Sequence, residues 1–388
     1  MYKEYCTGCG LCSAICQAEL EKDNKGFRVI KEERGYEHLL SQLCPVNGKQ
    51  CDMLDGKDIW GRTLGTYLAY SSDPEIRHLA SSGGVLSSLC LYLLNNKLVD
   101  GIVHTGVRPD NPIDTQTFLS VTRQEVIAHC GSRYSSSSPL MCIKEYLESG
   151  KKYAYIGKPC EITALRNYSK IDTRVDNAFP YMFSFFCAGA PSENANYALL
   201  NKMGVDPEAC VSLRYRGDGW PGYATAVDKS GNSHKLDYRT AWRDTLGRDI
   251  RKICRFCLDG IGEQADISAC DAWYLDDNMQ PVFEEAEGRN AVFCRNDKGL
   301  KLYSEAVKAG YIVSSDYRNY KEELQHSQSY QYQRRATMGS AILAMKLNHR
   351  QIPKYNKKLV KDYGRFSGVE MTLSVFKGTL SRIRTGKI

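Results

Sequence analysis

The sequence predicts an α+β protein with an α/β-type core, preceded by a small cysteine-rich module and followed by a helical C-terminal tail. Between residues 63 and 190, apolar runs of strand length alternate with segments of helical periodicity, which is typical of parallel strands joined by helices. Five of the 16 cysteines fall within the first 44 residues, and basic residues gather after residue 315. The 388 residues are 42% hydrophobic and 25% charged, a composition that excludes disordered and fibrous proteins.

The chain is long enough for several domains. We expect an N-terminal module at 1–56, two parts of one core at 57–150 and 151–315, and a tail at 316–388. No apolar run reaches the ~20 residues needed to cross a bilayer, and the first residues lack the apolar segment of a secretory signal. We therefore expect a cytoplasmic protein, in which cysteines serve as metal ligands or core residues more often than as disulfides.

The first cysteines carry the most specific motif. They follow the spacing C-x2-C-x2-C-x3-C, which is the cluster-binding run of bacterial ferredoxins, and they are Cys6, Cys9, Cys12 and Cys16. The alternative, four buried cysteines on one helix face, is disfavoured because Gly8 and Gly10 favour a loop. The run predicts a ferredoxin-like module that holds a [4Fe–4S] cluster.

The fourth ligand of this cluster is predicted from a proline. In two-cluster ferredoxins the fourth cysteine of each run binds the other cluster and precedes a proline. Here Cys16 precedes Gln17, whereas Cys44 precedes Pro45. The second run has lost its own three cysteines, whose places are taken by Arg34, Glu37 and Leu40. The expected ligands are Cys6, Cys9, Cys12 and Cys44.

Cys16 then becomes a small core residue and Cys51 a free thiol in the connector at 47–57. A rearranged site that uses Cys16 and Cys51 is the alternative.

The first part of the core begins with a predicted strand at 63–72, a helix at 85–94 and a strand at 99–107. A small polar turn precedes the helix and consists of Ser81, Ser82, Gly83 and Gly84. Such a turn at a helix N-terminus offers unpaired backbone N–H groups to an anion such as a flavin pyrophosphate. Ordinary helix capping explains the same residues equally well.

The second part of the core places cysteines at strand ends. A polar loop at 131–138 and a helix to residue 146 precede predicted strands at 152–156 and 181–186. Cys160 and Cys187 follow these strands directly, at the carboxyl ends where α/β sheets bind ligands. Further on, Cys254 and Cys257 form a C-x2-C pair.

Four thiolates suit either zinc or a [4Fe–4S] cluster, and the ferredoxin-type run on the same chain favours iron and sulfur. A thioredoxin-like role for the pair is disfavoured because it follows the polar stretch 243–252 rather than a strand. We expect most of the remaining cysteines to be core residues, and these are Cys90, Cys130, Cys142, Cys210, Cys270 and Cys294.

Together these motifs resemble the coenzyme F420 hydrogenase/dehydrogenase β-subunit family over residues 1–315. The resemblance rests on the ferredoxin run, Ser-Ser-Gly-Gly-Val at 81–85, Gly-Ser-Arg-Tyr at 131–134, Gly-Lys-Pro-Cys at 157–160, Phe-Cys-Ala-Gly at 186–189 and Cys-Arg-Phe-Cys at 254–257. It implies a flavin-binding core in which a second [4Fe–4S] cluster lies beside FAD. The ligands that it implies for this cluster are Cys160, Cys187, Cys254 and Cys257.

The resemblance also implies where FAD binds. The expected cofactor-binding residues are Arg77, Ser81, Ser82, Gly83, Gly84, Arg133, Tyr134 and Lys158. The chain departs from the family pattern at Lys158, Ala188 and Cys270, where the family more often has Thr, His and Gly. The family also includes ferredoxin-fed reductases and bacterial proteins of surface-polysaccharide synthesis, so the substrate does not follow from the resemblance.

The tail is strongly basic. Residues 316–388 hold 15 Lys and Arg against 5 Asp and Glu, within a chain whose formal net charge is +7. A helix at 366–384 is expected to be amphipathic, since apolar residues recur at helical spacing, namely Val369, Leu373, Phe376, Leu380 and Ile383. Such a helix either contacts the inner face of a membrane or packs on the protein. Nucleic-acid binding is not expected, because no reader motif accompanies the charge.

These observations predict an iron–sulfur flavoprotein oxidoreductase. Single electrons carried by the clusters would be combined by FAD into the two-electron step that an organic substrate needs. The expected electron partner is ferredoxin or a reduced deazaflavin, and self-association is left open. One alternative is an electron-transfer subunit that docks on a separate catalytic partner, and another is a zinc-stabilised scaffold.

Overall fold

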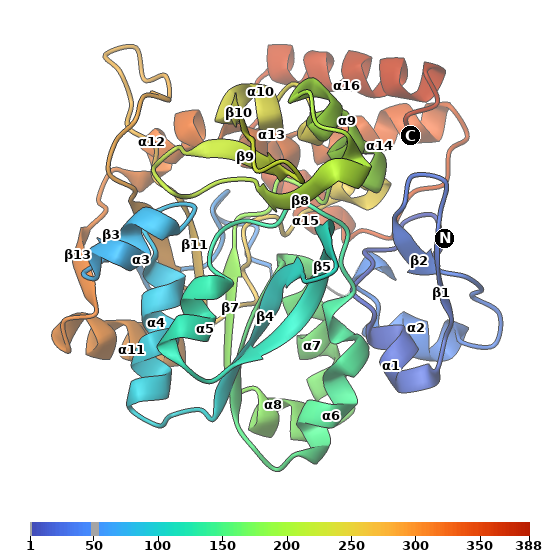
Figure 1. Ribbon diagram of the computed structural model, residues 1–388. Helices are drawn as coiled ribbons and strands as arrows, with labels where there is room; N and C mark the ends of the chain where they lie inside the picture. Colours follow the sequence, from blue (N-terminus) through green and yellow to red (C-terminus); the bar gives the residue numbers. More distant parts are fainter. Residues whose placement is uncertain (1, 48–53) are drawn as a thin grey trace.

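The computed structural model describes residues 2–47 and 54–388, which fold around a central mixed sheet (Figure 1). Its eight strands are, in spatial order, β13 (Ile312–Asp316), β3 (Gly65–Ser71), β12 (Asn290–Cys294), β11 (Ile267–Asp271), β7 (Tyr181–Phe185), β6 (Tyr153–Gly157), β4 (Gly101–Arg108) and β5 (Asn111–Ser120). The four strands β11, β7, β6 and β4 run parallel, and the flanking pairs are antiparallel. The carboxyl ends of the parallel strands therefore share one edge.

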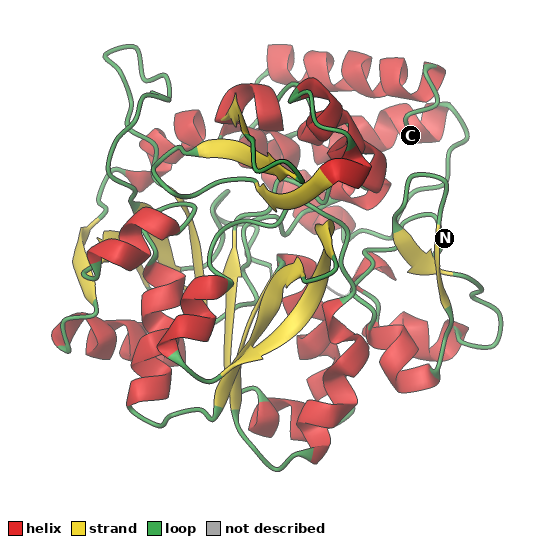
Figure 2. Cartoon of the chain, in the orientation of Figure 1, coloured by secondary structure: helices red, strands yellow, loops and turns green. Residues whose placement is uncertain are grey.

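Helices cover both faces of this sheet (Figure 2). On one face pack α3 (Pro74–Leu79), α4 (Val85–Asn95), α5 (Arg123–Ala128) and α11 (Asp297–Lys308). On the other pack η3 (Pro139–Cys142), α6 (Ile143–Glu148), α7 (Pro159–Ser169) and α8 (Arg174–Ala178). Alternate residues of a strand serve opposite faces, so Ala154 contacts the first layer and Tyr155 the second. This burial on both sides explains why the parallel strands are apolar throughout.

A smaller sheet and the N-terminal module flank the core. The smaller sheet contains β8 (Cys210–Arg214), β9 (Tyr223–Asp228) and β10 (Ser233–Asp237), and it packs with α9 (Glu193–Lys202), α10 (Tyr238–Trp242), η4 (Pro207–Ala209) and η5 (Leu246–Arg248). The module contains α1 (Leu11–Cys16), β1 (Leu20–Lys22), β2 (Arg28–Ile30), α2 (Glu37–Leu43) and η1 (Pro45–Asn47). The short helix η6 (Lys252–Phe256) carries the first cysteine of the C-x2-C pair.

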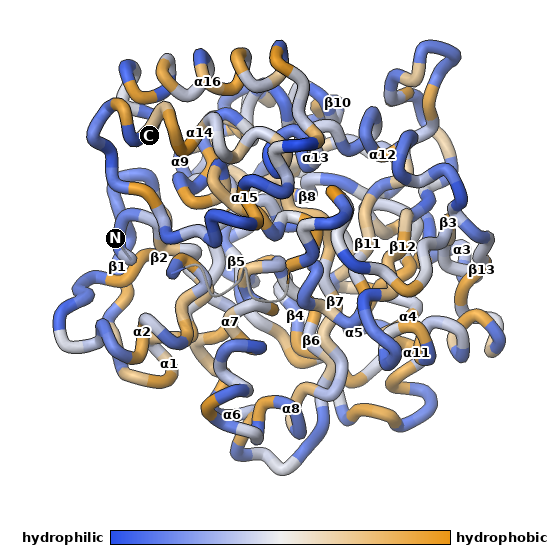
Figure 3. The backbone as a smooth tube through the Cα atoms, turned by 180° about the vertical axis from the view of Figure 1, so that it is seen from behind, coloured by the Kyte–Doolittle hydropathy of each residue, from blue (hydrophilic) through white to orange (hydrophobic). Residues whose placement is uncertain are grey.

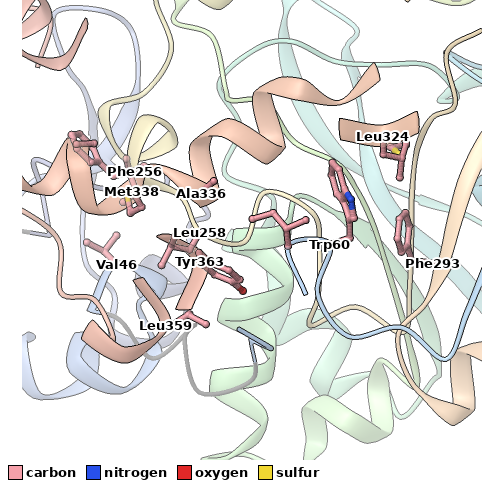
Figure 4. Close-up of a cluster of buried hydrophobic side chains, with 14 of the residues drawn as sticks. Val46, Trp60, Phe256, Leu258, Phe293, Leu324, Ala336, Met338, Leu359 and Tyr363 are labelled. Atoms are coloured by element: carbon pink, nitrogen blue, oxygen red, sulfur yellow. The ribbon is translucent and has the colours of Figure 1, made fainter. Parts of the chain in front are cut away.

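The C-terminal region is helical, as expected. It contains α12 (Tyr320–Ser327), α13 (Ser329–Ala336), α14 (Met338–Leu347), α15 (Lys357–Gly364) and α16 (Val369–Arg384). Figure 4 shows Val46 of the module, Phe256 and Leu258 beside the C-x2-C pair, and Met338 and Tyr363 of these helices in one buried cluster. This shared core joins both ends of the chain to the cysteine-bearing segment between them.

The expected α+β architecture with an α/β-type core is confirmed, and so are the strands and helices proposed between residues 63 and 186 and at 366–384. The main sheet takes strands from both 57–150 and 151–315, and the domain boundaries themselves stay a prediction. Of the six cysteines expected in the core, Cys90, Cys210, Cys270 and Cys294 are buried, whereas Cys130 and Cys142 are half-buried. Among the described residues, no helix is both long and apolar enough to cross a membrane.

Candidate functional site

Four cysteines of the N-terminal module line one small cavity. They are Cys6, Cys9, Cys12 and Cys44, and the rest of the wall is mainly apolar, with Leu40 and Leu43 of α2 among the side chains. Cys16 does not line this cavity. Its thiol instead donates to the carbonyl oxygen of Cys12 at 2.8 Å. The cavity thus gathers the four thiols that the sequence predicts as ligands, while Cys51 lies outside the described residues.

Two glycines shape the loop that carries Cys6 and Cys9. Gly8 and Gly10 have φ values of +75° and +85°, which residues other than glycine rarely adopt. The N–H of Gly8 donates to Sγ of Cys6 at 3.3 Å, and α1 begins directly after Gly10. Backbone N–H groups that donate to the sulfur atoms of an iron–sulfur cluster adjust its reduction potential. The loop therefore has the donor chemistry that a [4Fe–4S] cluster requires.

Burial favours the neutral form of two thiols in this cavity, Cys9 and Cys44. Burial raises the pKa of Cys9 to about 11, and the neighbouring Cys6 adds to this effect. Burial also raises the pKa of Cys44 strongly, with further contributions from Cys9, Cys6 and Cys12. A cationic iron core would compensate the cost of four clustered thiolates.

The second set of cysteines meets at the carboxyl edge of the main sheet. Gly157 at the end of β6 is paired with Ser184 of β7, and each strand is followed within a few residues by its cysteine. Cys160 occupies the first turn of α7, where the partial positive charge of the helix N-terminus favours a thiolate. Cys187 follows the end of β7.

The C-x2-C pair is brought to this edge by backbone pairing. The N–H of Cys187 donates to the carbonyl of Gly260 at 2.7 Å, and the N–H of Arg251 donates to that of Ala190 at 3.0 Å. The N–H of Ala190 in turn approaches Sγ of Cys254 at 3.5 Å. The segments before and after the pair therefore run beside the loop that follows Cys187.

Two cations lie beside the second set. Burial raises the pKa of Cys187 to about 12, and the thiol of Cys254 adds to this, whereas Lys158 and Arg334 act in the opposite direction. Arg334 donates to the carbonyl oxygens of Cys254 at 2.9 Å and Cys187 at 3.1 Å. Positive charge at this position favours four thiolates or an anionic cluster.

Among the described residues, no group of three or more His, Cys, Asp or Glu side chains converges on a point where a single metal ion would bind. In a [4Fe–4S] cube the thiolates bind different irons, so they need not converge on one point.

Two buried contacts link the cysteine sets. Arg251 donates from Nη1 to the carbonyl oxygen of Cys6 at 3.3 Å, and its own carbonyl accepts the N–H of Cys254 at 3.0 Å. Tyr155 is fully buried and donates to Glu161 at 3.2 Å. Burial and Glu161 raise the pKa of Tyr155, and the thiols of Cys9 and Cys160 both contribute. Tyr155 therefore lies near one thiol of each set.

Most residues of the turn proposed to bind a flavin phosphate already contact other parts of the protein. A side chain at Gly83 would lie 2.9 Å from the carbonyl oxygen of Ala69 and 2.9 Å from backbone atoms of Arg289 and Asn290. The hydroxyl of Ser82 donates to the carbonyl of Arg289 at 2.9 Å. The N–H of Val85 approaches the side-chain oxygen of Asn290 at 3.3 Å. Gly84, with φ +76°, packs against Ile76 and starts α4.

Ser81 is the exception in this turn. Its Oγ is buried and has no hydrogen-bond partner within the described parts of the chain. A Cβ added at Gly131 would lie 3.9 Å from this oxygen, so the turn faces the loop at 131–138. Ser138 of that loop has a second buried hydroxyl without a partner. These hydroxyls fit a polar ligand that the protein alone does not supply.

The arginines expected at the flavin have protein partners. Arg77 stacks on Tyr70 at 3.6 Å, pairs with Glu287 at 2.8 Å and donates to the carbonyl of Gly288 at 2.9 Å. Arg133 donates to the carbonyl oxygens of Pro112, Asp114 and Leu213.

Tyr134 and Lys158 are also engaged. The ring of Tyr134 lies against Tyr215 and Trp242. Lys158 pairs with Glu161 and donates to Ser137 at 2.6 Å. Burial lowers the pKa of Lys158. Glu161 and the thiol of Cys160 raise this pKa by more than burial lowers it, so the net shift is upward.

Three residues of the site do not stand out in the sequence, namely Arg251, Arg334 and Glu161. The only local indication for Arg251 is its position three residues before Cys254, within a basic stretch. Arg334 belongs to an Arg-Arg pair inside a helix with other buried positions, and an arginine inside a protein usually has a specific partner. Nothing in the sequence indicates that it lies beside a cysteine some 80 residues earlier in the chain.

Comparison with known families gives two matches. Residues 66–144 match the N-terminal region of the coenzyme F420 hydrogenase/dehydrogenase beta subunit, and residues 150–319 match its C-terminal region. Among similar curated proteins, the F420-dependent formate dehydrogenase 1 subunit beta of Methanococcus maripaludis is 27% identical over 63% of this chain and 60% of its own length. The coenzyme F420 hydrogenase subunit beta of Methanosarcina barkeri is 27% identical over 64% of this chain and 81% of its own.

A solved structure has a similar fold. A chain of the F420-reducing [NiFe] hydrogenase complex from Methanosarcina barkeri superposes with a TM-score of 0.52 and 21% identity, covering 72% of this chain and 94% of that chain. The matched family regions begin after the N-terminal module and end before α12.

Proposed function

The chain belongs to the coenzyme F420 hydrogenase/dehydrogenase beta-subunit family, and from this premise we propose that it is an iron–sulfur flavoprotein oxidoreductase. It binds two [4Fe–4S] clusters and FAD, and it reduces or oxidises an organic substrate. When bound, the clusters supply single electrons and FAD combines them into a two-electron or hydride step. The electron partner is reduced F420 or ferredoxin.

One observation supports this proposal most strongly. Two sets of four cysteines are each gathered in a partly buried site, and Arg251 contacts the backbone of both. The ligands that we propose for the first cluster are Cys6, Cys9, Cys12 and Cys44. The ligands that we propose for the second are Cys160, Cys187, Cys254 and Cys257. Within the family, this pairing of two sets favours electron transfer over a structural role for the cysteines.

The chain's own side chains prepare these sites. Apolar walls around the first set exclude water from the thiolates, which strengthens their electrostatic interactions with the metal. Lys158 and Arg334 place positive charge beside the second set, which stabilises an anionic cluster. Tyr155 is fully buried near a thiol of each set.

FAD fits this chain in part. The unpartnered hydroxyls of Ser81 and Ser138 are the residues that we propose to bind it, with Gly131 leaving room for the ligand. Arg77 and Arg133 already donate hydrogen bonds to backbone carbonyl oxygens. We therefore propose that they hold the turn at 81–84 and the loop at 131–138 in place. Lys158 stays a candidate because it lies beside both the second cysteine set and the loop at 131–138.

A second function has support of its own. The chain covers only 60% of the formate dehydrogenase subunit, and the solved relative belongs to a multi-subunit complex. An electron-transfer subunit that docks on a separate catalytic partner is therefore the alternative.

Mixing the anaerobically purified chain with reduced F420 or reduced ferredoxin tests the proposal. Bleaching of the flavin absorbance by one of the donors, with no added subunit, supports a self-sufficient reductase. A flavin that both donors leave oxidised contradicts it, and reduction that appears only after a second subunit is added supports the alternative.

A further inference from the structure

A cavity of about 280 Å³ lies where the C-terminal helices meet the loop of the C-x2-C pair. Arg255 and Phe256 line it from that loop. The other lining residues come from α13, α14, α16 and the end of the chain, and they are Tyr330, Gln333, Arg334, Thr337, Met338, Ala341, Ser374, Val375, Gly378, Thr379, Arg382 and Ile388. The volume approaches that of pockets that hold small organic ligands.

Three arginines line this cavity, and two of them, Arg255 and Arg382, have no counter-charge among the described side chains. Arg255, Arg334 and Arg382 each have a buried Nε without a hydrogen-bond partner. None of the three guanidinium groups pairs with a carboxylate of the described residues, and no Asp or Glu lines the cavity. Arg334 is only 7% exposed, and the thiols of the second set lie beside it. Arg255 and Arg382 are partly buried, and such a charge is most stable when an anion accompanies it.

Other contacts hold these guanidinium groups in place. Arg255 donates from Nη2 to the carbonyl of Arg248 at 3.0 Å, and Arg382 donates to the hydroxyl of Thr379 at 3.3 Å. Arg334 is fixed by the carbonyls beside the second cysteine set. Burial and the neighbouring Arg255 lower the pKa of Arg382, as expected for two guanidinium groups held close together. The charge is thus pre-organised rather than free to turn toward solvent.

We propose that this cavity binds the phosphate or diphosphate group of an organic substrate. One guanidinium group can donate two parallel hydrogen bonds to the oxygens of a phosphate, and Arg255 and Arg382 together balance a doubly charged anion. A monocarboxylate would neutralise only one of these two charges. The hydroxyls of Tyr330 and Ser374 add donors around the same space.

Most of the cavity lies outside the matched family regions. Both family matches end by residue 319, and all of its lining residues except Arg255 and Phe256 lie beyond that point. The C-terminal helices close a binding space over the segment between Cys254 and Cys257. The role as a substrate site rests on the proposed function, whereas anion binding does not depend on it.

Calorimetric titration of the full-length, anaerobically purified protein with inorganic pyrophosphate tests the proposal. We expect saturable binding to one site, weakened about tenfold or more in Arg382→Gln, because a hydrogen-bonded charge is lost. Lys377→Gln removes the same charge from an exposed position of α16 and should bind like the wild type. Ser374→Asp adds a negative charge at the cavity and should also weaken binding, which provides a second variant should Arg382→Gln misfold.

Several outcomes would overturn this inference. These are equal binding by all variants, equal weakening by Lys377→Gln and Arg382→Gln, or no binding of pyrophosphate or phosphate by the wild type. Binding of citrate but not pyrophosphate would overturn the phosphate assignment. Iron and flavin counts on the same sample separate these results from a failure of the proposed redox function.

Discussion

The guanidinium of Arg251 donates from Nη1 to the carbonyl oxygen of Cys6 at 3.3 Å. The same residue accepts, through its backbone carbonyl, the N–H of Cys254. One residue therefore touches the backbone of both cysteine sets. A second donor of Arg251 reaches Ser136 of the loop at 131–138, at 2.8 Å. This contact places the proposed flavin loop next to the two sets.

The first prediction concerns the fourth ligand of the N-terminal module. Cys44 lines the cavity of the first set and Cys16 does not, so Cys44→Ala should lose about four irons per chain. Cys16→Ala should lose few or none, because its thiol only donates to the Cys12 carbonyl. Iron and acid-labile sulfide are counted in both variants. The reverse pattern would make Cys16 the ligand.

The second prediction concerns the flavin. Ser81→Ala removes the hydroxyl that has no protein partner, and FAD should dissociate about tenfold or more readily if that hydroxyl donates to a phosphate. Ser82→Ala is the matched control, because the Ser82 hydroxyl already donates to the carbonyl oxygen of Arg289. Fluorescence titration of FAD measures both. Equal affinities in wild type and Ser81→Ala would remove this turn from the site.

A loss of FAD from Gly83→Val would not identify the flavin site, because the variant should also disturb the fold. A side chain at Gly83 would clash with backbone atoms of Ala69, Arg289 and Asn290, so the variant should disturb the sheet itself.

The third prediction concerns the joint between the C-terminal helices and the core. Arg335 and Glu263 form an ion pair whose side chains are 0% and 1% exposed. Glu263 also accepts the N–H groups of Asp55 and Arg62. Arg335→Met leaves Glu263 buried without its cation and should cost about 3–5 kcal/mol of stability. The double variant with Glu263→Gln should recover part of that loss, as measured by thermal unfolding. Strictly additive losses would mean that the pair is not coupled.

The fourth prediction concerns α16. Its residues Thr379 and Ile383 are buried, whereas Val369 and Leu373 at the other end are 78% and 51% exposed. Hydrophobic and hydrophilic residues alternate along this helix (Figure 3). Because one side packs on α14, deleting residues 366–388 should lower the melting temperature. If the exposed apolar residues also contact membranes, the full chain should bind anionic liposomes at low salt and release them as salt increases. No liposome binding at low salt would leave packing as the role of the helix.

The fifth prediction is a pH dependence of stability. Burial and the neighbouring His129 lower the pKa of His104 from 6.5 to about 4. The unfolded chain therefore binds a proton at a higher pH than the folded chain does. The contribution of neutral His104 to the free energy of unfolding is therefore fully present above pH 6.5. It falls by roughly 3 kcal/mol as the pH decreases to 4. His104→Gln should flatten the melting temperature over this range, whereas substitution of the exposed His38 should not. An unchanged profile in His104→Gln would assign the effect to other groups.

Much of the fold follows from local pattern. The strands that contain Tyr155 and Phe183 are apolar throughout because helices cover both faces, and such runs are recognisable without a structure. The cysteines at 6, 9, 12, 160 and 187 were found from spacing or from their position after a strand. The proline after Cys44 singled it out, and the structure places it at the cavity with the other three.

The rest depends on contacts that are distant in sequence. Arg251 meets Cys6 across 245 residues, and Arg334 meets Cys187 across 147. No local pattern encodes such distances. Arg77 and Arg133 were expected at a phosphate because arginine often binds one, but carbonyl oxygens of neighbouring loops satisfy them. A guanidinium is equally suited to either partner, and only the fold decides between them.

The central claim is that the two cysteine sets hold two [4Fe–4S] clusters next to a flavin. The most direct measurement is the visible spectrum of the anaerobically purified full-length chain, together with iron, sulfide, zinc and flavin counts. About eight irons per chain and bound FAD are expected. A colourless protein that contains zinc and no flavin would contradict the claim.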